Sequence, residues 1–552
     1  MAKTITEMKR NAAAIILFLL VACIGLRRLD AQTRTPATSA LRVSAEDLLT
    51  NPVGENWPSY NGDYTGRRFS SLREINLANV EQLRAAWVFH PGNSQRLEAT
   101  PVVILGVMYV TSANDVLALD ARTGRALWHY SRPVSSGLLD DAAGHINRGV
   151  AVRENFVYSE TDDAHLLCLD ARSGNLIWDV QYADKARHYG ATSAPLVVKD
   201  EVVVGTAGGD SGVRGFVAAY DAVTGKPRWR LWTIPGPGEF GSASWPGNSY
   251  LHGGATTWMP GTYDPELDTL YWTTSNAAPD FVGDSRPGDD LYTASVLAID
   301  ANSGKLKWYF QFTPHDVYDY DANETPVLVD VDKDGTTQHL LLQANRNGFF
   351  YVLDRTNGKF LRANPFVKKL NWATGIDAFG RPILSDRVPT KEGTAICPGI
   401  VGATNWFSPS YNPGTGLFYV MALENCNIYF AQAKAFVRGE TYYNTGTKFP
   451  KDEHAQKLLL ALSPSDGKEV WRYPQTGRGN SWGGILTTAG GLVFFGDDAE
   501  SLEAVDAKTG HALWHFNTGQ SIHASPMTYA VGGVQYVAIS AGSDVFSFAL
   551  PH

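Results

Sequence analysis

Acidic and histidine side chains gather in one stretch of the chain, which reads TPHDVYDYDANETPVLVD from Thr313 to Asp330. Carboxylates bind hard cations such as calcium, and a carboxylate beside a bound substrate can accept a proton. Because this stretch interrupts otherwise neutral, strand-like sequence, it is a candidate site. Acidic loop residues are more often solvated, so composition alone leaves both interpretations open.

The composition describes the body that must position such a site. The 552 residues include 47 Lys and Arg against 56 Asp and Glu, a net charge of −9, and only 19% are charged. The chain is too apolar and aromatic for a disordered protein, and its acidic balance argues against nucleic-acid binding. With 53 Gly and 15 Trp, we expect a large β-rich body of short strands and tight turns.

One phrase recurs along the chain: an apolar strand, Asp, a short polar step, Gly and then Trp. It reads VLALDARTGRALWHY from Val116 and LEAVDAKTGHALWHF from Leu502. Asp starts a turn by bonding nearby backbone, and Gly tolerates a positive φ, so the phrase predicts a β-hairpin. Its seven turn glycines are Gly124, Gly174, Gly225, Gly304, Gly358, Gly467 and Gly510.

Further strand-like runs precede each phrase, so each unit has about four strands, as in a propeller blade. The long gap between Gly358 and Gly467 leaves room for one more, degenerate unit at 411–430. The N-terminal run around Trp87 is expected to complete the last blade. Residues 32–552 are therefore predicted to form a single all-β, eight-bladed β-propeller, in which the repeated Trp residues pack between neighbouring blades.

The first 31 residues are interpreted as an export segment. Basic residues precede an apolar run at 12–26, which has the length of a signal-peptide core rather than of a membrane span. Three outcomes stay open for 1–31: cleavage near Ala31, lipidation of Cys23, or retention as a helical membrane anchor. All three predict a periplasmic protein.

Three cysteines follow this segment. Cys168 lies in a strand-like run and is expected to be a buried free thiol. Cys397 and Cys426 are the better pair for a disulfide in an oxidising compartment. No CxxCH motif occurs, so the sequence predicts no covalently attached c-type haem.

Several motifs occur together and in order: GVRGFVAAYD, SNAAP, RPGDD, TPHDVYD, NRNGFFYVLDRTNG, CPG, NW and SWGG. On these motifs the chain resembles the quinoprotein alcohol dehydrogenases of the methanol and ethanol dehydrogenase type, without a fused cytochrome c domain. The resemblance extends from about Trp57 to Phe548. It implies an eight-bladed propeller that holds pyrroloquinoline quinone (PQQ) and a calcium ion on the channel axis.

The resemblance also implies a metal site and a catalytic pair. The calcium ligands would be Asp210, Asn276 and Asp319, and hard oxygen donors suit calcium. The family usually carries Glu where Asp210 stands. Asp319 would be the general base that takes the alcohol proton while hydride moves to the quinone. Arg346 would hydrogen-bond the quinone oxygens and stabilise the charge that builds there.

A flat quinone needs a stacking face with polar and cationic donors around it. The resemblance implies that Trp258 is the floor of this cofactor bed. Trp406 is either a further contact or a packing residue. The other implied contacts, besides Arg346, are Glu98, Arg148, Thr192, Asn405 and Trp482.

One departure from the family pattern concerns the lid over the quinone. Methanol and ethanol members carry two adjacent, disulfide-bonded cysteines before the NRG motif, whereas Ala142 and Ala143 stand here. His145 either covers that face or is a solvated loop residue. Cys397 and Cys426, by contrast, match a disulfide of the family.

These implications predict a periplasmic, PQQ- and calcium-dependent dehydrogenase that oxidises an alcohol, by expectation a primary one, to the aldehyde. Its electrons would leave to a separate cytochrome c or to a membrane quinone. One alternative is a non-catalytic or degenerate PQQ-propeller that serves as a scaffold or sensor. Another is a quinoprotein dehydrogenase acting on a sugar or polyol. Joint retention of Asp319, Arg346, Asn276 and Trp258 favours an enzyme over a scaffold.

Overall fold

The computed structural model describes residues 42–92, 96–139, 142–451, 453–477 and 481–551. Contacts divide the chain into Met1–Arg42 and Val43–His552, and the second unit holds the sheets. The export segment predicted at 1–31 lies outside the described residues, and Cys23 with it. Among the helices that the structure describes, none combines the length and the hydropathy needed to cross a membrane.

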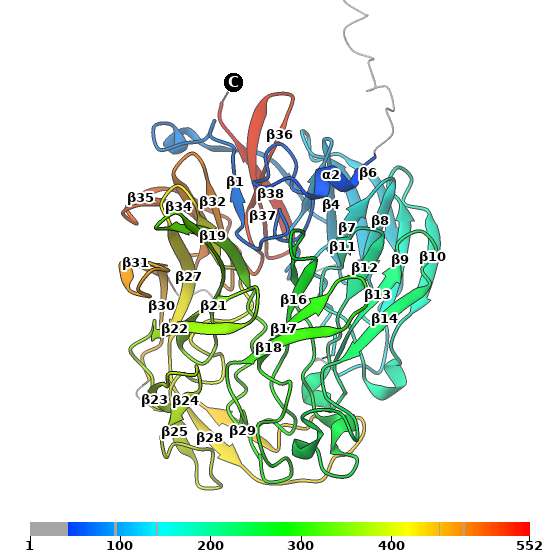
Figure 1. Cartoon of the computed structure of the whole chain (residues 1–552). Helices are drawn as coiled ribbons and strands as arrows, with labels where there is room; N and C mark the ends of the chain where they lie inside the picture. Colours follow the sequence, from blue (N-terminus) through cyan, green and yellow to red (C-terminus); the bar gives the residue numbers. More distant parts are fainter. Residues whose placement is uncertain (1–41, 93–95, 140–141, 452, 478–480, 552) are drawn as a thin grey trace, which may run out of the picture. The chain divides into compact units, whose positions relative to one another are not determined.

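Five four-stranded antiparallel sheets follow one another along the chain (Figure 1). The first two are β3 (Val102–Ile104), β4 (Val107–Ser112), β5 (Asp115–Asp120) and β6 (Ala126–Ser131), and then β7 (Ala151–Arg153), β8 (Phe156–Glu160), β9 (His165–Asp170) and β10 (Leu176–Gln181). The next three are β11 (Leu196–Val198), β12 (Glu201–Val204), β13 (Phe216–Asp221) and β14 (Pro227–Trp232); β15 (Thr262–Asp264), β16 (Thr269–Thr273), β17 (Ser295–Asp300) and β18 (Leu306–Gln311); and β19 (Val327–Lys333), β20 (Thr336–Ala344), β21 (Phe349–Asp354) and β22 (Lys359–Pro365).

Three more large sheets complete a set of eight within the described residues. They are β26 (Ser410–Asn412), β27 (Leu417–Glu424), β30 (Gln456–Leu462) and β31 (Glu469–Pro474); β1 (Phe69–Ser70), β32 (Ile485–Thr488), β33 (Leu492–Asp497), β34 (Ser501–Asp506) and β35 (Ala512–Asn517); and β2 (Arg84–Phe89), β38 (Asp544–Ala549), β37 (Val534–Ala541) and β36 (Met527–Val531). Two small sheets join β23 (Ala373–Ile376) to β24 (Pro382–Leu384), and β28 (Asn427–Ala431) to β25 (Thr394–Ile396) and β29 (Thr445–Lys448). A short helix, α2, covers Ala45–Leu48.

The degenerate unit predicted at 411–430 does not form a sheet of its own. Strands β26 and β27 from this stretch pair with β30 and β31, which come from the phrase that begins at Leu459. The remainder of the stretch, β28, belongs to a small sheet. The sequence prediction was wrong here because a long insertion between β27 and β30 separates two halves of one sheet.

The eighth large sheet combines an early strand of the second unit, β2, with its last three strands, β36 to β38. Strand β2 pairs antiparallel with β38, with Trp87 opposite Ser547. This pairing confirms the prediction that the N-terminal strand completes the last sheet. It also gives β38 a partner on both sides, since β37 pairs with it from the other edge, and paired edges do not recruit other chains.

The repeated Trp packs between neighbouring sheets, as predicted, and its ring lies against the turn glycine of the next sheet. A Cβ added to Gly304, whose φ is +67°, would lie 2.4 Å from the indole of Trp229. A Cβ on Gly174 would lie 2.5 Å from Trp128, whose Nε1 donates to the Ala171 carbonyl at 3.0 Å. Glycine is therefore needed twice over at these turns, for its positive φ and for the close approach of the ring.

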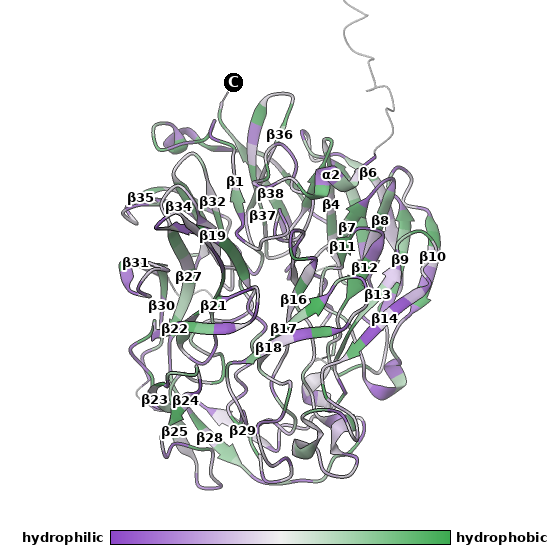
Figure 2. Ribbon diagram, viewed as in Figure 1, coloured by the Kyte–Doolittle hydropathy of each residue, from purple (hydrophilic) through white to green (hydrophobic). Residues whose placement is uncertain are grey.

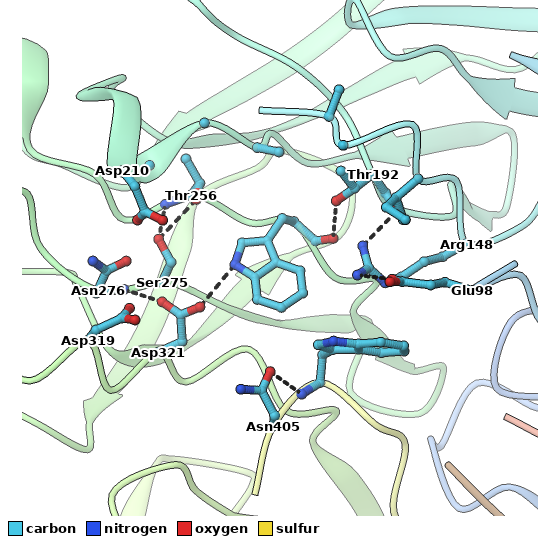
Figure 3. A pocket seen from close by; sticks show the side chains of 18 of the residues that line it. Glu98, Arg148, Thr192, Asp210, Thr256, Ser275, Asn276, Asp319, Asp321 and Asn405 are labelled. Carbon is cyan, nitrogen blue, oxygen red and sulfur yellow. Dashed lines mark hydrogen bonds and ion pairs between the residues drawn. The ribbon is translucent and has the colours of Figure 1, made fainter. Parts of the chain in front are cut away.

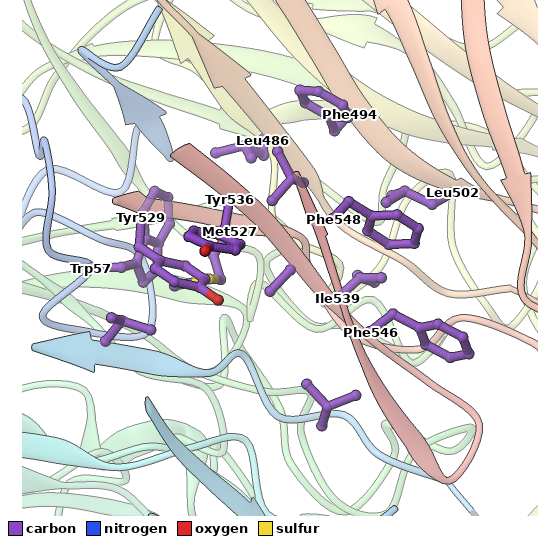
Figure 4. Close-up of a cluster of buried hydrophobic side chains, with 14 of the residues drawn as sticks. Trp57, Leu486, Phe494, Leu502, Met527, Tyr529, Tyr536, Ile539, Phe546 and Phe548 are labelled. Carbon is purple, nitrogen blue, oxygen red and sulfur yellow. The ribbon is translucent and has the colours of Figure 1, made fainter. Parts of the chain in front are cut away.

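The core lies between neighbouring sheets. In the first sheet β5 is almost wholly buried, whereas most residues of β6 are exposed or half-buried, and Figure 2 shows hydrophilic residues along outer strands such as β14. One buried cluster joins residues of three sheets, and Figure 4 shows Phe494, Met527 and Phe548 within it. Burial of apolar surface contributes about 25 cal/mol of stabilisation per Å², and it stabilises the packing of each sheet against its neighbours.

The cysteines also behave as predicted. Cys397 and Cys426 form a disulfide across a sequence separation of 29 residues, and Cys168 is a buried free thiol. The disulfide joins the residue after β25 to the residue before β28, at the end where these two antiparallel strands pair.

Candidate active site

A cavity of about 380 Å³ lies where loops from most of the sheets converge. Seven of the eight large sheets contribute a lining residue from the loop that precedes β3, β7, β11, β15, β19, β26 or β32. The connections between β12 and β13, β16 and β17, and β20 and β21 also reach it. The repeated sheets therefore place loops of different sequence around a single cavity.

All ten residues that the sequence selected for the cofactor, the metal and the chemistry line this cavity. They are Glu98, Arg148, Thr192, Asp210, Trp258, Asn276, Asp319, Arg346, Asn405 and Trp482. Figure 3 shows the three predicted metal ligands on one side of the cavity, and the polar rim that contains Arg148 on the other. Trp406, which the sequence left undecided, is also a lining residue.

A buried ion pair forms the rim. Arg148 Nη2 lies 2.5 Å from Glu98 Oε2, and Arg148 Nη1 donates to the Thr192 carbonyl at 2.9 Å. The Arg148 guanidinium also lies 5.0 Å from the ring centre of Trp258 and 4.7 Å from that of Trp406. A desolvated cation between two indole faces is attracted by both, so the rim holds the aromatic walls in place.

Arg346 occupies the opposite wall, beside the predicted base. Its Nη1 donates to the Asp319 carbonyl at 3.1 Å and lies 3.6 Å from the Asp319 carboxylate. Its Nη2 donates to Asn405 Oδ1 at 3.2 Å. Burial lowers the pKa of Arg346, but the carboxylates of Asp321 and Asp319 raise it by more, so this side chain stays a cation.

Asp321 connects the floor, the metal side and the arginine. Its carboxylate accepts from the Asn276 backbone N–H at 2.6 Å, a contact drawn in Figure 3. It also accepts from Trp258 Nε1 at 3.1 Å, and it pairs with Arg346 Nη2 at 3.1 Å. Asp321 also lines the cavity, and three partners hold its two carboxylate oxygens, so this residue fixes the orientation of its neighbours.

An acidic cluster lies on the metal side. Carboxylate oxygens of Asp210, Asp280 and Asp319 all lie within 4.8 Å of one another. Burial raises the pKa of Asp319 well above its ordinary value, Arg346 opposes that rise, and the neighbouring carboxylate of Asp210 adds to it. The backbone of Asp319 has a φ of +63°, which is uncommon for a residue other than glycine and is found at functional sites.

The loop that replaces the adjacent cysteines of the family lines the cavity through small and apolar residues. Ala142 is buried, and Ala143, Gly144 and Ile146 face the cavity. His145 is exposed and is not among the lining residues. The structure thus favours the solvated-loop interpretation of His145, and Ile146 is the larger side chain that the loop presents.

Sequence reasoning missed two carboxylates at this site. Asp321 lies two residues after Asp319 in the same acidic stretch, and Asp280 lies four residues after Asn276. Their closeness to predicted ligands was the available signal. A missed cation, Arg96, lies 2.9 Å from Glu98, and nothing in the local sequence indicated that its side chain turns toward the rim.

Comparison with known proteins identifies this arrangement. Residues 57–363 and 472–537 match the family described as PQQ, glucose/ethanol/alcohol dehydrogenase, β-propeller domain. The quinohemoprotein alcohol dehydrogenase ADH IIB of Pseudomonas putida is 42% identical over 89% of this chain and 74% of its own length. The quinoprotein alcohol dehydrogenase PedH of Pseudomonas putida is 38% identical over 91% and 88%.

Solved structures agree with the sequence relatives. A europium-containing methanol dehydrogenase superposes with a TM-score of 0.85 at 31% identity, covering 92% of this chain and 100% of its own. The chain belongs to the family of PQQ-dependent alcohol dehydrogenases, which are β-propeller oxidoreductases. The expected family and enzyme class are confirmed, and so is the all-β propeller fold, apart from its number of blades.

The residues at the site fit the cofactor of that family. PQQ is planar and anionic, and the cavity offers indole faces together with two arginines. Arg148 Nε is buried and has no hydrogen-bond partner among the described residues, so a donor is left over beside the indoles. The acidic cluster likewise matches the hard oxygen donors of a metal ion.

Proposed function

We propose that this protein is a periplasmic, PQQ- and metal-dependent dehydrogenase that oxidises a primary alcohol to the aldehyde. We also infer that its eight large sheets are the blades of one propeller. The observation that carries the enzymatic proposal is the position of Asp319, which lies beside Arg346, belongs to the acidic cluster and lines the same cavity as Trp258.

Each side chain at the site has its own role in the proposed reaction. When bound, PQQ supplies a hydride acceptor, and the metal supplies a Lewis acid. The Asp319 carboxylate accepts the hydroxyl proton of the alcohol. Arg346 Nη1 lies 3.6 Å from this carboxylate and keeps it in position. Arg346 itself is fixed by Asp321 and Asn405. Ile400 and Val401 line the cavity and keep water from the reacting groups.

The metal ligands that we propose first are Asp210, Asn276 and Asp319, with Ca²⁺ as the ion because all three are hard oxygen donors. A trivalent lanthanide is the second candidate. The observation that favours it is the number of carboxylates beside the cavity, together with the europium in the related methanol dehydrogenase. A competition experiment, in which Ca²⁺ and a lanthanide compete for binding to the metal-free protein, distinguishes the two candidates.

Electrons leave, in this proposal, to a separate cytochrome c or to a membrane quinone. The support is a relative named 1-butanol dehydrogenase (cytochrome c), from Thauera butanivorans, which is 36% identical over 89% of this chain. The proposed periplasmic location rests on the apolar run at 12–26 behind basic residues. Export of a reporter fused after Ala31, and its loss when the run is interrupted by charges, tests the location.

The central experiment reconstitutes the metal-free protein with PQQ and with either Ca²⁺ or a lanthanide. PQQ binding is followed by tryptophan quenching, and turnover is followed by dye-coupled oxidation of ethanol and 1-butanol, with glucose and glycerol as alternative substrates. We expect micromolar or tighter PQQ binding and turnover of primary alcohols only when PQQ and metal are both present.

Each other outcome selects an alternative. Binding of PQQ without turnover of any substrate supports the non-catalytic scaffold or sensor. Preferential oxidation of glucose or glycerol supports the sugar or polyol dehydrogenase. Absence of PQQ binding at micromolar concentration contradicts the proposed function as a whole.

A further inference from the structure

Asp280 is a buried carboxylate that makes no hydrogen bond with any residue that the structure describes. Its exposed fraction is 0%, and neither carboxylate oxygen has a hydrogen-bond partner among the described residues. Burying an ionised carboxylate with no compensating partner costs several kcal/mol, so such a group is ordinarily paired, bound to a metal or protonated. The Asp280 carboxylate is therefore expected either to bind a cation or to carry a proton.

Neighbouring aspartates do not share this property. Asp321 is held by two hydrogen-bond donors and by an arginine. Asp316 accepts from the backbone N–H groups of Tyr318 at 3.1 Å and of Tyr320 at 3.0 Å. Asp290 forms a buried ion pair with Arg286. Asp280 thus differs from three acidic residues of the same region in having no donor of its own.

The oxygens of Asp280 instead face two other carboxylates. Together with oxygens of Asp210 and Asp319 they lie within 4.8 Å of one another. Calcium–oxygen bonds are about 2.3–2.6 Å long, so two oxygens bound to one ion are at most about 5 Å apart. One cation at the centre of the three carboxylates can therefore contact all of them without any rearrangement of the backbone.

We propose that Asp280 is a direct ligand of the metal ion, so that three carboxylates, Asp210, Asp280 and Asp319, hold it. This inference rests on the proposed metal-dependent function. It changes the ligand set expected from the sequence, which had two carboxylates and the Asn276 amide. Three negative charges neutralise a trivalent ion completely, and they attract it more strongly than a divalent ion in a low-dielectric site.

Metal binding by the full-length protein without PQQ tests the assignment, with no need for activity. Tb³⁺ is the probe, detected by luminescence that nearby tryptophans sensitise, and Ca²⁺ is measured by its displacement. We expect Asp280→Asn to weaken Tb³⁺ binding at least ten-fold and Ca²⁺ binding by a smaller factor. The matched control is Asp284→Asn, an exposed residue of the same loop, for which we expect binding within two-fold of wild type.

The outcomes separate the two levels of the proposal. If Asp280→Asn binds both ions within two-fold of wild type, Asp280 is a protonated acid, and the inference is wrong while the proposed function stands. If wild type binds neither ion, both fail. Should Asp280→Asn not fold, as judged by circular dichroism, anomalous diffraction from Tb³⁺-soaked wild-type crystals decides, because an ion more than about 3.5 Å from both Asp280 oxygens excludes direct ligation.

Discussion

Replacing Asp319 by Asn isolates proton transfer from cofactor binding. The amide has nearly the same size as the carboxylate and keeps one oxygen toward the acidic cluster, but it does not accept the hydroxyl proton. The backbone of Asp319 has a φ of +63°, which Asn tolerates about as well as Asp does. The Asp319 carbonyl, which accepts from Arg346 at 3.1 Å, is unchanged by the substitution.

The size of the effect follows from the role that is removed. A positioned general base contributes about 10²–10⁴-fold to a reaction rate, and each factor of ten corresponds to about 1.4 kcal/mol of activation free energy. We therefore expect Asp319→Asn to lower kcat by about 10²–10⁴-fold. PQQ affinity should change by less than about three-fold, because the indole and arginine contacts on the far side of the cavity are untouched.

The assay is steady-state, dye-coupled oxidation of ethanol at saturating PQQ and metal, with the metal raised until kcat no longer rises. Saturation is needed because the substitution also removes one charge from the acidic cluster. Asp284→Asn, which alters the same charge at an exposed position, should retain wild-type kcat. A kcat within five-fold of wild type for Asp319→Asn would refute the assignment of Asp319 as the base.

Three further predictions concern the floor, the repeat and a buried acid. Trp258→Leu removes the stacking face and should weaken PQQ binding at least ten-fold in an absorbance titration; a loss under two-fold would exclude a floor role. Gly304→Ala should lower the free energy of unfolding by about 1–3 kcal/mol more than Gly519→Ala does. Both glycines have a positive φ, but only at Gly304 would the added Cβ meet a ring, that of Trp229 at 2.4 Å. Equal losses of unfolding free energy in urea would contradict the packing of Trp229 on Gly304. Burial raises the pKa of Glu160 from 4.5 to about 8, so wild type should lose stability as the pH rises through this window, because the unfolded chain ionises first. Glu160→Gln should escape that loss and be the more stable protein at pH 8.5, by up to a few kcal/mol, with little difference at pH 4; no pH-dependent difference in urea unfolding would contradict it.

Local chemistry explains why much of the fold was predictable. The Asp–Gly turn and the Trp that follows it are decided within a dozen residues, and the docking of Trp128 on Gly174 repeats one local geometry. The unit expected at 411–430 failed because strand partners separated by an insertion are not visible locally. Strand β27 finds β30 across the segment that contains β28 and β29, and only the register in space shows this.

The sequence by itself determined the fold class, the family motifs and the ten residues that face one cavity. These follow from repeated local patterns and from motifs that keep their order along the chain. Only the tertiary structure decided the state of Asp280, because its lack of a hydrogen-bond partner and its nearness to Asp210 and Asp319 depend on three loops that are distant in sequence. Pairing, burial and the distance between charges are properties of the assembled sheets, and they determine which carboxylates remain open to a cation.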